Sequence, residues 1–187
     1  MTRVLRTGGL VALALLATGC GYNRIQELDE QVNKARGQIQ AQLQRRADLI
    51  PNLVETVKGY AKQEQTIFTE VAEARARLAG AIQTGDPEQM AQANEALRAP
   101  LGRLLALVEN YPQLKSDANF RQLMDELTGT ENRIATARQD YNDAANAFNT
   151  FIRRFPTNLT AKLFGYSTPK PYFEARAGAE EVPKVSF

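Results

Sequence analysis

Cys20 is the residue whose type and position most directly indicate a chemical step in this sequence. It is the single cysteine, and it follows an apolar stretch over residues 10–17 that is itself preceded by Arg3 and Arg6. A basic start, a short apolar core and small residues before a cleavage point are typical of a secretory signal peptide. The core is too short for a transmembrane helix, which needs about 20 apolar residues.

The string Leu16-Ala17-Thr18-Gly19-Cys20 resembles a bacterial lipobox. The resemblance implies that the Cys20 thiol receives a diacylglyceryl group, that the chain is cut before Cys20, and that the new amino group is acylated. Several acyl chains together anchor a protein stably, at about 0.8 kcal/mol per buried methylene. We therefore predict a signal peptide over 1–19, a lipidated N-terminus over 20–23 and membrane attachment through Cys20. An ordinary secretory signal with an incidental cysteine is the alternative.

The predicted location is the cell envelope, with the protein facing the periplasm or the exterior. Gly21 follows the cysteine where enteric lipoproteins retained at the inner membrane carry Asp. Gly21 thus slightly favours the outer membrane if the organism has two membranes.

The remaining residue types exclude most kinds of catalysis. The chain has no His, which removes the commonest general base and metal ligand, and one Cys cannot form an internal disulfide or a Cys-rich zinc site. Ser167-Thr168-Pro169-Lys170 has the S-x-x-K spacing of penicillin-recognising enzymes, but Pro169 argues against the helical turn which that chemistry requires. We predict no enzymatic activity, no cofactor and no metal site.

The charge distribution argues against nucleic acid as a partner. The net charge of +2 comes from Arg3 and Arg6, and residues 20–187 carry equal numbers of acidic and basic side chains. Binding to nucleic acid depends on clustered Lys and Arg that neutralise phosphates, and a neutral chain offers no such cluster.

Two sets of polar residues share helix faces and form the candidate site. The first set is Arg45, Asp48, Asn52 and Glu55, which are three, four and three residues apart. The second set is Glu131, Arg138 and Asn142, which are seven and four residues apart. One interpretation is two exposed charged faces. The other is that the faces meet inside a helical bundle or line a groove for a partner, with Asp48 and Arg138 as one candidate facing pair.

The elements that position these residues are predicted from the apolar pattern. Apolar residues recur at steps of three and four in runs over 25–43, 53–78, 90–108 and 120–155. This period is that of amphipathic helices. The fold class that follows is all-α: an elongated, antiparallel, up-and-down four-helix bundle of long helices over residues 24–155.

Local signals predict where the helices end. Pro51 favours a kink over a break between the first two runs, although continuity there stays open. Residues 80–86 are expected to form a loop, with Asp86 as N-cap and Pro87 at the first helical position. Pro100 is expected to bend the third helix, and Ser116 to cap a fourth helix near 116–155.

The tail, residues 156–187, combines prolines with five of the fourteen aromatic residues: Phe164, Tyr166, Tyr172, Phe173 and Phe187. Prolines exclude one long helix, and aromatic residues are scarce in disordered segments. We predict a short helix over 157–164, followed by an extended segment whose aromatic residues dock on the bundle. The alternative is a free tail whose carboxyl end is captured by a PDZ-like groove.

Five strings along the chain resemble the LemA family. They are QLQRRADLIPNLVETVKGYAKQE (42–64), RLLALVENYPQLKSDANFRQL (103–123), TENRIATARQDYNDA (130–144), FPTNLTAKLFGY (155–166) and PKVSF (183–187). The resemblance covers about residues 22–187 and implies a small, membrane-attached bacterial protein with a helical bundle. It implies no established reaction, substrate or cofactor. Many members have an uncleaved transmembrane helix where this chain has a lipobox.

Together these features predict a lipid-anchored, non-enzymatic scaffold or interaction protein of the envelope, with another envelope protein as partner. A self-assembling structural element is the first alternative, because long apolar seams can continue between molecules. An envelope hydrolase is the weaker alternative.

Overall fold

The computed structural model describes the backbone of residues 2–61 and 63–173, and the side chains from Gly21 onward in those ranges. This part of the chain forms seven helices and no strand: α1 (Thr2–Lys58), α2 (Gln65–Thr84), α3 (Pro87–Ala96), α4 (Arg98–Val108), α5 (Pro112–Ser116), α6 (Ala118–Arg153) and α7 (Thr157–Leu163). The predicted all-α class is confirmed.

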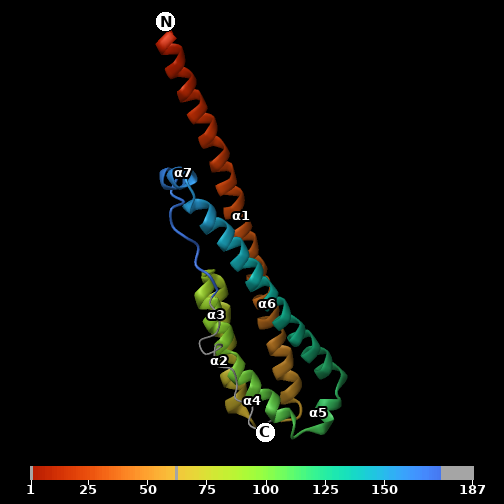
Figure 1. The fold of residues 1–187 in the computed structure, drawn as a ribbon. Helices are drawn as coiled ribbons and strands as arrows, with labels where there is room; N and C mark the ends of the chain where they lie inside the picture. The colour runs from red at the N-terminus through yellow and green to blue at the C-terminus, as the bar shows by residue number, and fades with distance from the viewer. Residues whose placement is uncertain (1, 62, 174–187) are drawn as a thin grey trace, which may run out of the picture.

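Two long helices, α1 and α6, form the central part of the molecule. α1 has 57 residues, about 86 Å of helix, and α6 has 36 residues, about 54 Å. They run antiparallel and side by side, and the first part of α1 projects beyond the rest of the molecule (Figure 1). Their facing apolar stripes form the centre of the core, which includes Ile25, Leu28, Val32, Ile39, Leu43, Ile134, Tyr141, Phe148 and Ile152.

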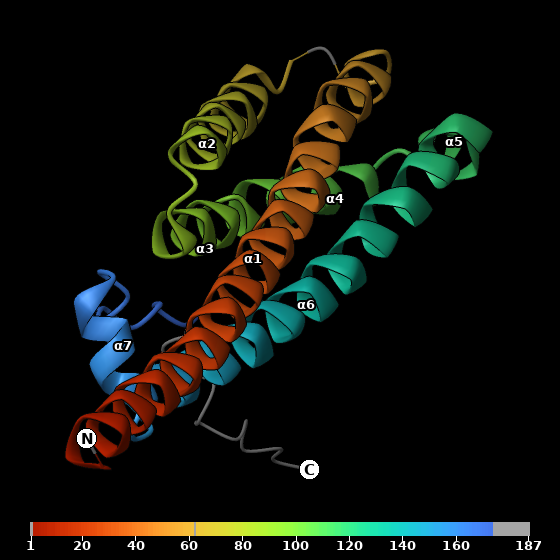
Figure 2. The same ribbon diagram turned by 90° about the horizontal axis from the view of Figure 1, so that it is seen from above.

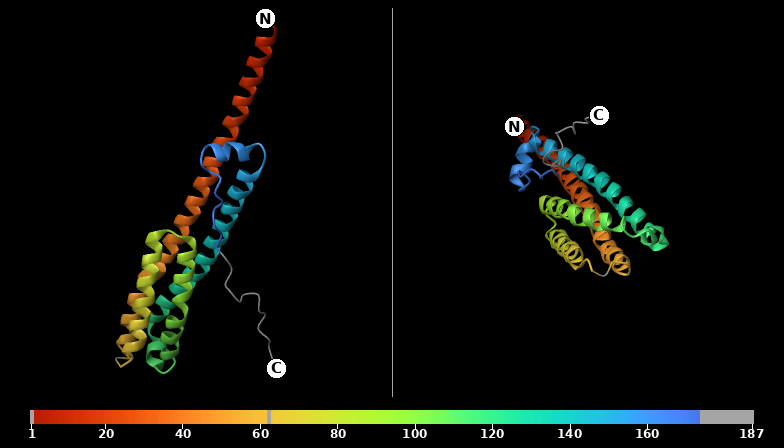
Figure 3. Two further views of the ribbon diagram at one scale, coloured as in Figure 1. Left: turned by 90° about the vertical axis from the view of Figure 1, so that its left-hand side faces the viewer. Right: turned by 90° about the horizontal axis from the view of Figure 1, so that it is seen from below.

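The specific antiparallel four-helix bundle of long helices is not confirmed. α2 packs against α1, and α3 and α4 pack against α2, so that these three helices cover only the half of α1 farther from the N-terminus (Figures 1 and 3). α6 runs along both halves of α1, and α7 packs beside the half nearer the N-terminus (Figure 1). The molecule is therefore a long helix pair with different covers at its two ends.

Pro51 lies inside α1, so the helix is continuous there. A proline inside a helix removes the N–H that would bond to the carbonyl four residues earlier, here that of Ala47. Arg75 of α2 takes over this role, because its Nε donates to the Ala47 carbonyl oxygen at 2.8 Å. The chain turns instead between Lys58 and Gln65, inside the run over 53–78 that the sequence assigns to one helix.

Three helix ends differ from the prediction. α2 continues to Thr84, and Gly85 ends it with a φ of 66°, so the predicted loop over 80–86 is shorter. The helix is broken at Leu97, whereas the sequence predicted a bend at Pro100. Pro100 is the third residue of α4, where its missing N–H needs no partner inside the helix. Ser116 ends α5, and Asp117 caps α6 through its Oδ1, which accepts from the Phe120 N–H at 2.9 Å.

Two predicted helix starts are confirmed. Asp86 is the N-cap of α3 and accepts from the Glu88 and Gln89 N–H groups, with Pro87 at the first helical position. The short helix expected near 157–164 is α7, which contacts both α1 and α6 beside the projecting part of α1 (Figure 2). Residues 164–173, called the strap below, then run back along α6 (Figure 3).

Candidate functional site

The polar residues predicted on the first helix lie at an exposed face of α1. Asp48, Asn52 and Glu55 are all exposed. Asp48 accepts from Gln44 Nε2 at 2.8 Å, and Glu55 accepts from Lys58 Nζ at 2.9 Å. These contacts of Asp48 and Glu55 therefore run along their own helix and not to α6.

The predicted partly buried pair of Asp48 and Arg138 does not form. Asp48 is exposed on α1, whereas the Arg138 guanidinium lies 5.4 Å from the centre of the Phe173 ring. The register of α1 against α6 brings other side chains together, among them Arg45 with Glu126 and Arg46 with Glu131.

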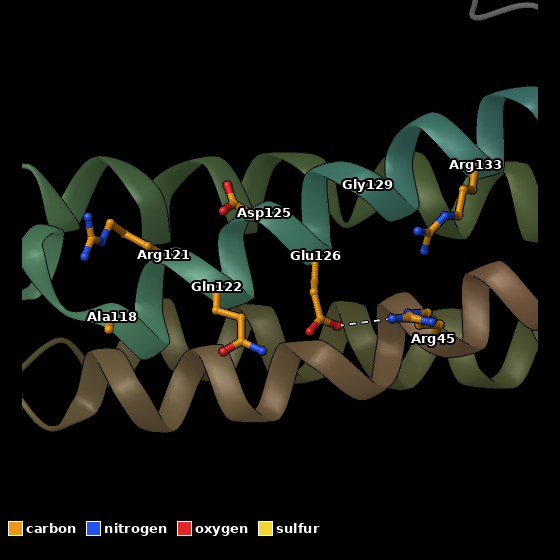
Figure 4. Close-up of a pocket in the computed structure, with 8 residues that line it drawn as sticks. All are labelled: Arg45, Ala118, Arg121, Gln122, Asp125, Glu126, Gly129 and Arg133. Atoms are coloured by element: carbon orange, nitrogen blue, oxygen red, sulfur yellow. Dashed lines mark hydrogen bonds and ion pairs between the residues drawn. The ribbon is translucent and has the colours of Figure 1, made fainter.

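A polar groove of about 510 Å³ lies between α1 and α6 at the level of Arg45 (Figure 4). Arg45 Nη2 reaches across it to Glu126 Oε2 at 3.3 Å. The remaining lining residues all come from α6: Ala118, Arg121, Gln122, Asp125, Gly129 and Arg133. A second groove of about 350 Å³, lined by residues that include Gln38, Gln42 and Asp140, shares Arg133 with the first. The two grooves thus adjoin at Arg133 on the α1–α6 seam.

A buried polar cluster centres on Arg46, a residue that the sequence prediction missed. Arg46 is only 5% exposed, and its Nη1 donates to Asn94 Oδ1 of α3 at 3.1 Å and pairs with Glu131 of α6. It therefore joins three helices. The available signal was that Arg46 stands among core positions of the apolar run, between Leu43 and Ile50.

The strap brings the two other predicted polar residues of α6 together with the predicted tail. Asn142 pairs with the backbone of Phe173 in both directions: Nδ2 donates to the carbonyl at 3.0 Å, and Oδ1 accepts from the N–H at 2.8 Å. Arg138 lies over the same Phe173 ring. Phe173 is 5% exposed and meets Tyr141 edge to face, with ring centroids 5.2 Å apart.

A second asparagine holds the strap in the same way two turns further along α6. Asn149 is buried, donates from Nδ2 to the Lys170 carbonyl at 2.9 Å, and accepts at Oδ1 from the Lys170 N–H at 2.7 Å. The Lys170 side chain continues to α1, where it pairs with Asp29. Each asparagine therefore satisfies both polar groups of one strap residue, as a neighbouring β-strand would.

Tyr141 fixes the middle of the strap. Its hydroxyl donates to the Pro171 carbonyl at 3.1 Å. Burial raises the pKa of Tyr141 above the usual value near 10, Arg36 opposes the shift, and Asp86 adds to it. Tyr141 is therefore a hydrogen-bond donor at neutral pH.

The other predicted tail residues have different surroundings. Tyr166 accepts at its hydroxyl from Gln26 Nε2 at 2.6 Å, and its ring lies 6.4 Å from that of Phe148. The Phe164 ring is half exposed and lies 4.6 Å from that of Tyr22. Tyr172 is 45% exposed, and Phe187 lies outside the described residues.

The described residues offer no constellation for catalysis or metal binding. The Ser167–Lys170 string lies in the non-helical strap, and Lys170 is engaged by Asp29. No group of three or more carboxylate, Cys or His side chains in this part could hold a metal ion. Within the same part, no helix is apolar over a sufficient length to cross a bilayer. Cys20 lies in α1, and its side chain is not among those described.

Comparison with known proteins gives matches along most of the chain. Two magnetosome proteins MamQ of Paramagnetospirillum magneticum are each 30% identical over 180 residues, covering 84% of this chain and 66% of theirs. The magnetosome protein MamQ of Magnetospirillum gryphiswaldense is 28% identical over the same shares. Protein LemA of Metamycoplasma hominis is 25% identical, over 75% of this chain and 63% of its own. The chain thus spans slightly less than two thirds of these relatives.

The family resemblance seen in the sequence is confirmed by this comparison. The model of the LemA family matches residues 35–187, which include the C-terminal part of α1, all later helices and the strap. The polar groove, the Arg46 cluster and both asparagine contacts lie within the matched region. The chain belongs to the LemA family.

Proposed function

We propose that this chain is a lipid-anchored, non-enzymatic helical scaffold of the bacterial cell envelope, which binds another envelope protein along the α1–α6 groove. The observation that carries the proposal is the groove itself. It is open, polar and lined by three arginines and two carboxylates, Arg45, Arg121, Arg133, Asp125 and Glu126. Mixed charges of this kind suit a charged protein segment, for which they provide orientation and specificity.

The anchor is the second part of the proposal. Acylation of Cys20 would tether α1 at the membrane, and α1 is one helix from the N-terminal segment to Lys58. A rigid helix would hold the groove at a set distance from the bilayer. The apolar stretch, the small residues and the position of Cys20 support this part.

The anchor is tested by Cys20→Ser in cells. We expect fatty-acid labelling to disappear and the protein to move from the membrane to the soluble fraction. Labelling that persists in the variant contradicts acylation at this residue. Tight membrane retention of the parent protein without any labelling would indicate an uncleaved helix instead.

The groove is tested by a photo-crosslinking residue placed at Asp125, which lines the groove, and at Arg77, which is exposed on α2. We expect Asp125 to yield a discrete crosslinked envelope protein that Arg77 does not yield. The crosslink should weaken when Arg133, shared by both grooves, is changed to Glu. Equal products from both positions contradict the groove as the binding surface. Crosslinks to a second copy would support the self-assembling element.

A further inference from the structure

Large exposed hydrophobic side chains cluster at one end of the molecule. Six such residues occur in the described part, and four of them fall within residues 155–164: Phe155, Leu159, Leu163 and Phe164. Phe155 is 80% exposed and Leu163 is 79% exposed. Single exposed apolar residues are ordinary on soluble proteins, but a contiguous group marks a surface that contacts something apolar.

The helix within this cluster, α7, is short but amphipathic. Thr160 and Ala161 are buried, whereas Leu159 and Leu163, four residues apart, share the exposed face. The sequence over 153–173 contains four basic residues and no acidic one: Arg153, Arg154, Lys162 and Lys170. An exposed apolar face with basic neighbours has the composition of a segment that lies in the interface of an anionic bilayer.

The position of α7 in the fold matches this composition. A Cβ built on Gly21 would lie 3.9 Å from Thr157 Cγ2, and the Tyr22 ring lies 4.6 Å from that of Phe164. The residues that follow Cys20 therefore lie directly beside α7. α7 lies across the end of the body from which the N-terminal part of α1 projects (Figures 1 and 3). If acyl chains on Cys20 enter the bilayer, the helix rise of about 1.5 Å per residue leaves α7 at the headgroup level.

We propose that the surface formed by Phe155, Leu159, Leu163 and Phe164 docks on the phospholipid bilayer that holds Cys20. The apolar side chains enter the interface to a depth of about 5–10 Å, and Arg153, Arg154 and Lys162 contact anionic headgroups. With Cys20, this surface gives the body a second point of attachment and sets its orientation to the membrane. The inference rests on the proposed lipid anchor for its location.

The absence of Trp from the sequence makes a direct test available. Single probes are introduced as Phe155→Trp and Leu163→Trp in the full-length lipoprotein, with Tyr60→Trp as the matched control. Tyr60 is also exposed, at 41%, and follows the far end of α1. The proteins are reconstituted in vesicles of phosphatidylethanolamine and phosphatidylglycerol with brominated acyl chains, which quench tryptophan on contact. Circular dichroism verifies that each variant folds, and Leu159→Trp replaces either probe that does not.

The expected result is a blue-shifted emission and loss of most fluorescence for the Phe155→Trp and Leu163→Trp probes, with neither change for Tyr60→Trp. Vesicle flotation separates this inference from the anchor. Flotation without quenching at either α7 probe overturns the docking surface and leaves the anchor intact. Flotation and quenching that persist after Cys20→Ser support the surface as an attachment that does not depend on Cys20, and fatty-acid labelling of the parent protein then decides the acyl anchor separately. Failure of the parent protein to float overturns both.

A second copy of the chain is the competing occupant of this surface. Self-association would shift the emission of the α7 probes as protein concentration rises, with no effect of lipid bromination. That outcome overturns docking on the bilayer.

Discussion

Arg46 is the residue whose charge is most deeply buried in the described part of the molecule. Its pairing with Glu131 and Asn94 offsets the loss of water, but Arg46 Nε is buried and has no hydrogen-bond partner there. A buried ion pair adds little net stability to the folded protein. Removal of one partner is nevertheless strongly destabilising, because it leaves an isolated buried charge. Arg46 therefore fixes the relative positions of α1, α3 and α6 more than it strengthens them.

We expect Glu131→Ala to lower the free energy of unfolding by about 2 kcal/mol, less than a fully buried pair because the Glu131 side chain is 45% exposed. The matched control is Glu126→Ala, which breaks the exposed Arg45–Glu126 pair and is expected to change stability by less than about 1 kcal/mol. Urea unfolding of both variants measures the difference. Adding Arg46→Met to Glu131→Ala should recover part of the loss, and equal effects of the two single variants would contradict the role of the cluster.

Arg75 is the residue that allows α1 to pass through Pro51. We expect Arg75→Ala to lower the free energy of unfolding by about 1–2 kcal/mol, because the buried Ala47 carbonyl loses its donor. In a Pro51→Ala background the N–H at position 51 can bond to that carbonyl, so Arg75→Ala should then have a smaller effect. Arg77→Ala, exposed on the same helix, should stay within about 0.5 kcal/mol of the parent. Equal losses from Arg75→Ala in both backgrounds would exclude this compensation.

At the scale of elements, the strap depends on asparagine side chains for its position. Asn149→Ala removes both hydrogen bonds to the Lys170 backbone, and we expect a loss of about 2 kcal/mol with faster hydrogen exchange over residues 166–173. Asn146→Ala is the control, because Asn146 is exposed one turn earlier on α6. If the two variants exchange alike, the Asn149 hydrogen bonds do not hold the strap in place.

At the scale of the whole molecule, the two ends of α1 have different covers. α2, α3 and α4 cover the half farther from Cys20, α7 and the strap cover the half nearer Cys20, and α6 runs along both halves. This division predicts that changes in the tail affect one half of the molecule selectively.

Truncation after Gly165 should lower the free energy of unfolding by about 3 kcal/mol, since it removes the buried Phe173 along with Tyr166 and the Lys170 contacts. It should also increase binding of an apolar dye and hydrogen exchange near residues 22–32, without a matching change in α2. Truncation after Phe173 keeps the strap and serves as the control. An unchanged melting temperature after the first truncation, with loss of partner recovery, would instead support a free binding tail.

The sequence alone determined the helical class and several helix starts. Apolar spacing of three and four residues is a local property, as is the pairing of Asp86 as N-cap with Pro87 at the first position, so both could be derived without the fold. The family-like strings are also a property of the sequence alone, and they fall in the region that the family model matches. The sequence singles out Arg138 and Asn142 on the last helix and Phe173 in the tail. It does not predict that Phe173 contacts both of the other two residues.

Only the tertiary structure decided which side chains meet. The continuity of α1 depends on Arg75, which is distant in sequence from Ala47, and the Arg46 cluster depends on Asn94 and Glu131 from two other helices. A helix face gives a residue its direction, but the register between helices is set by the packing of the whole core. The exposed cluster around α7 likewise becomes visible only when folding buries Thr160 and Ala161 and leaves their apolar neighbours uncovered.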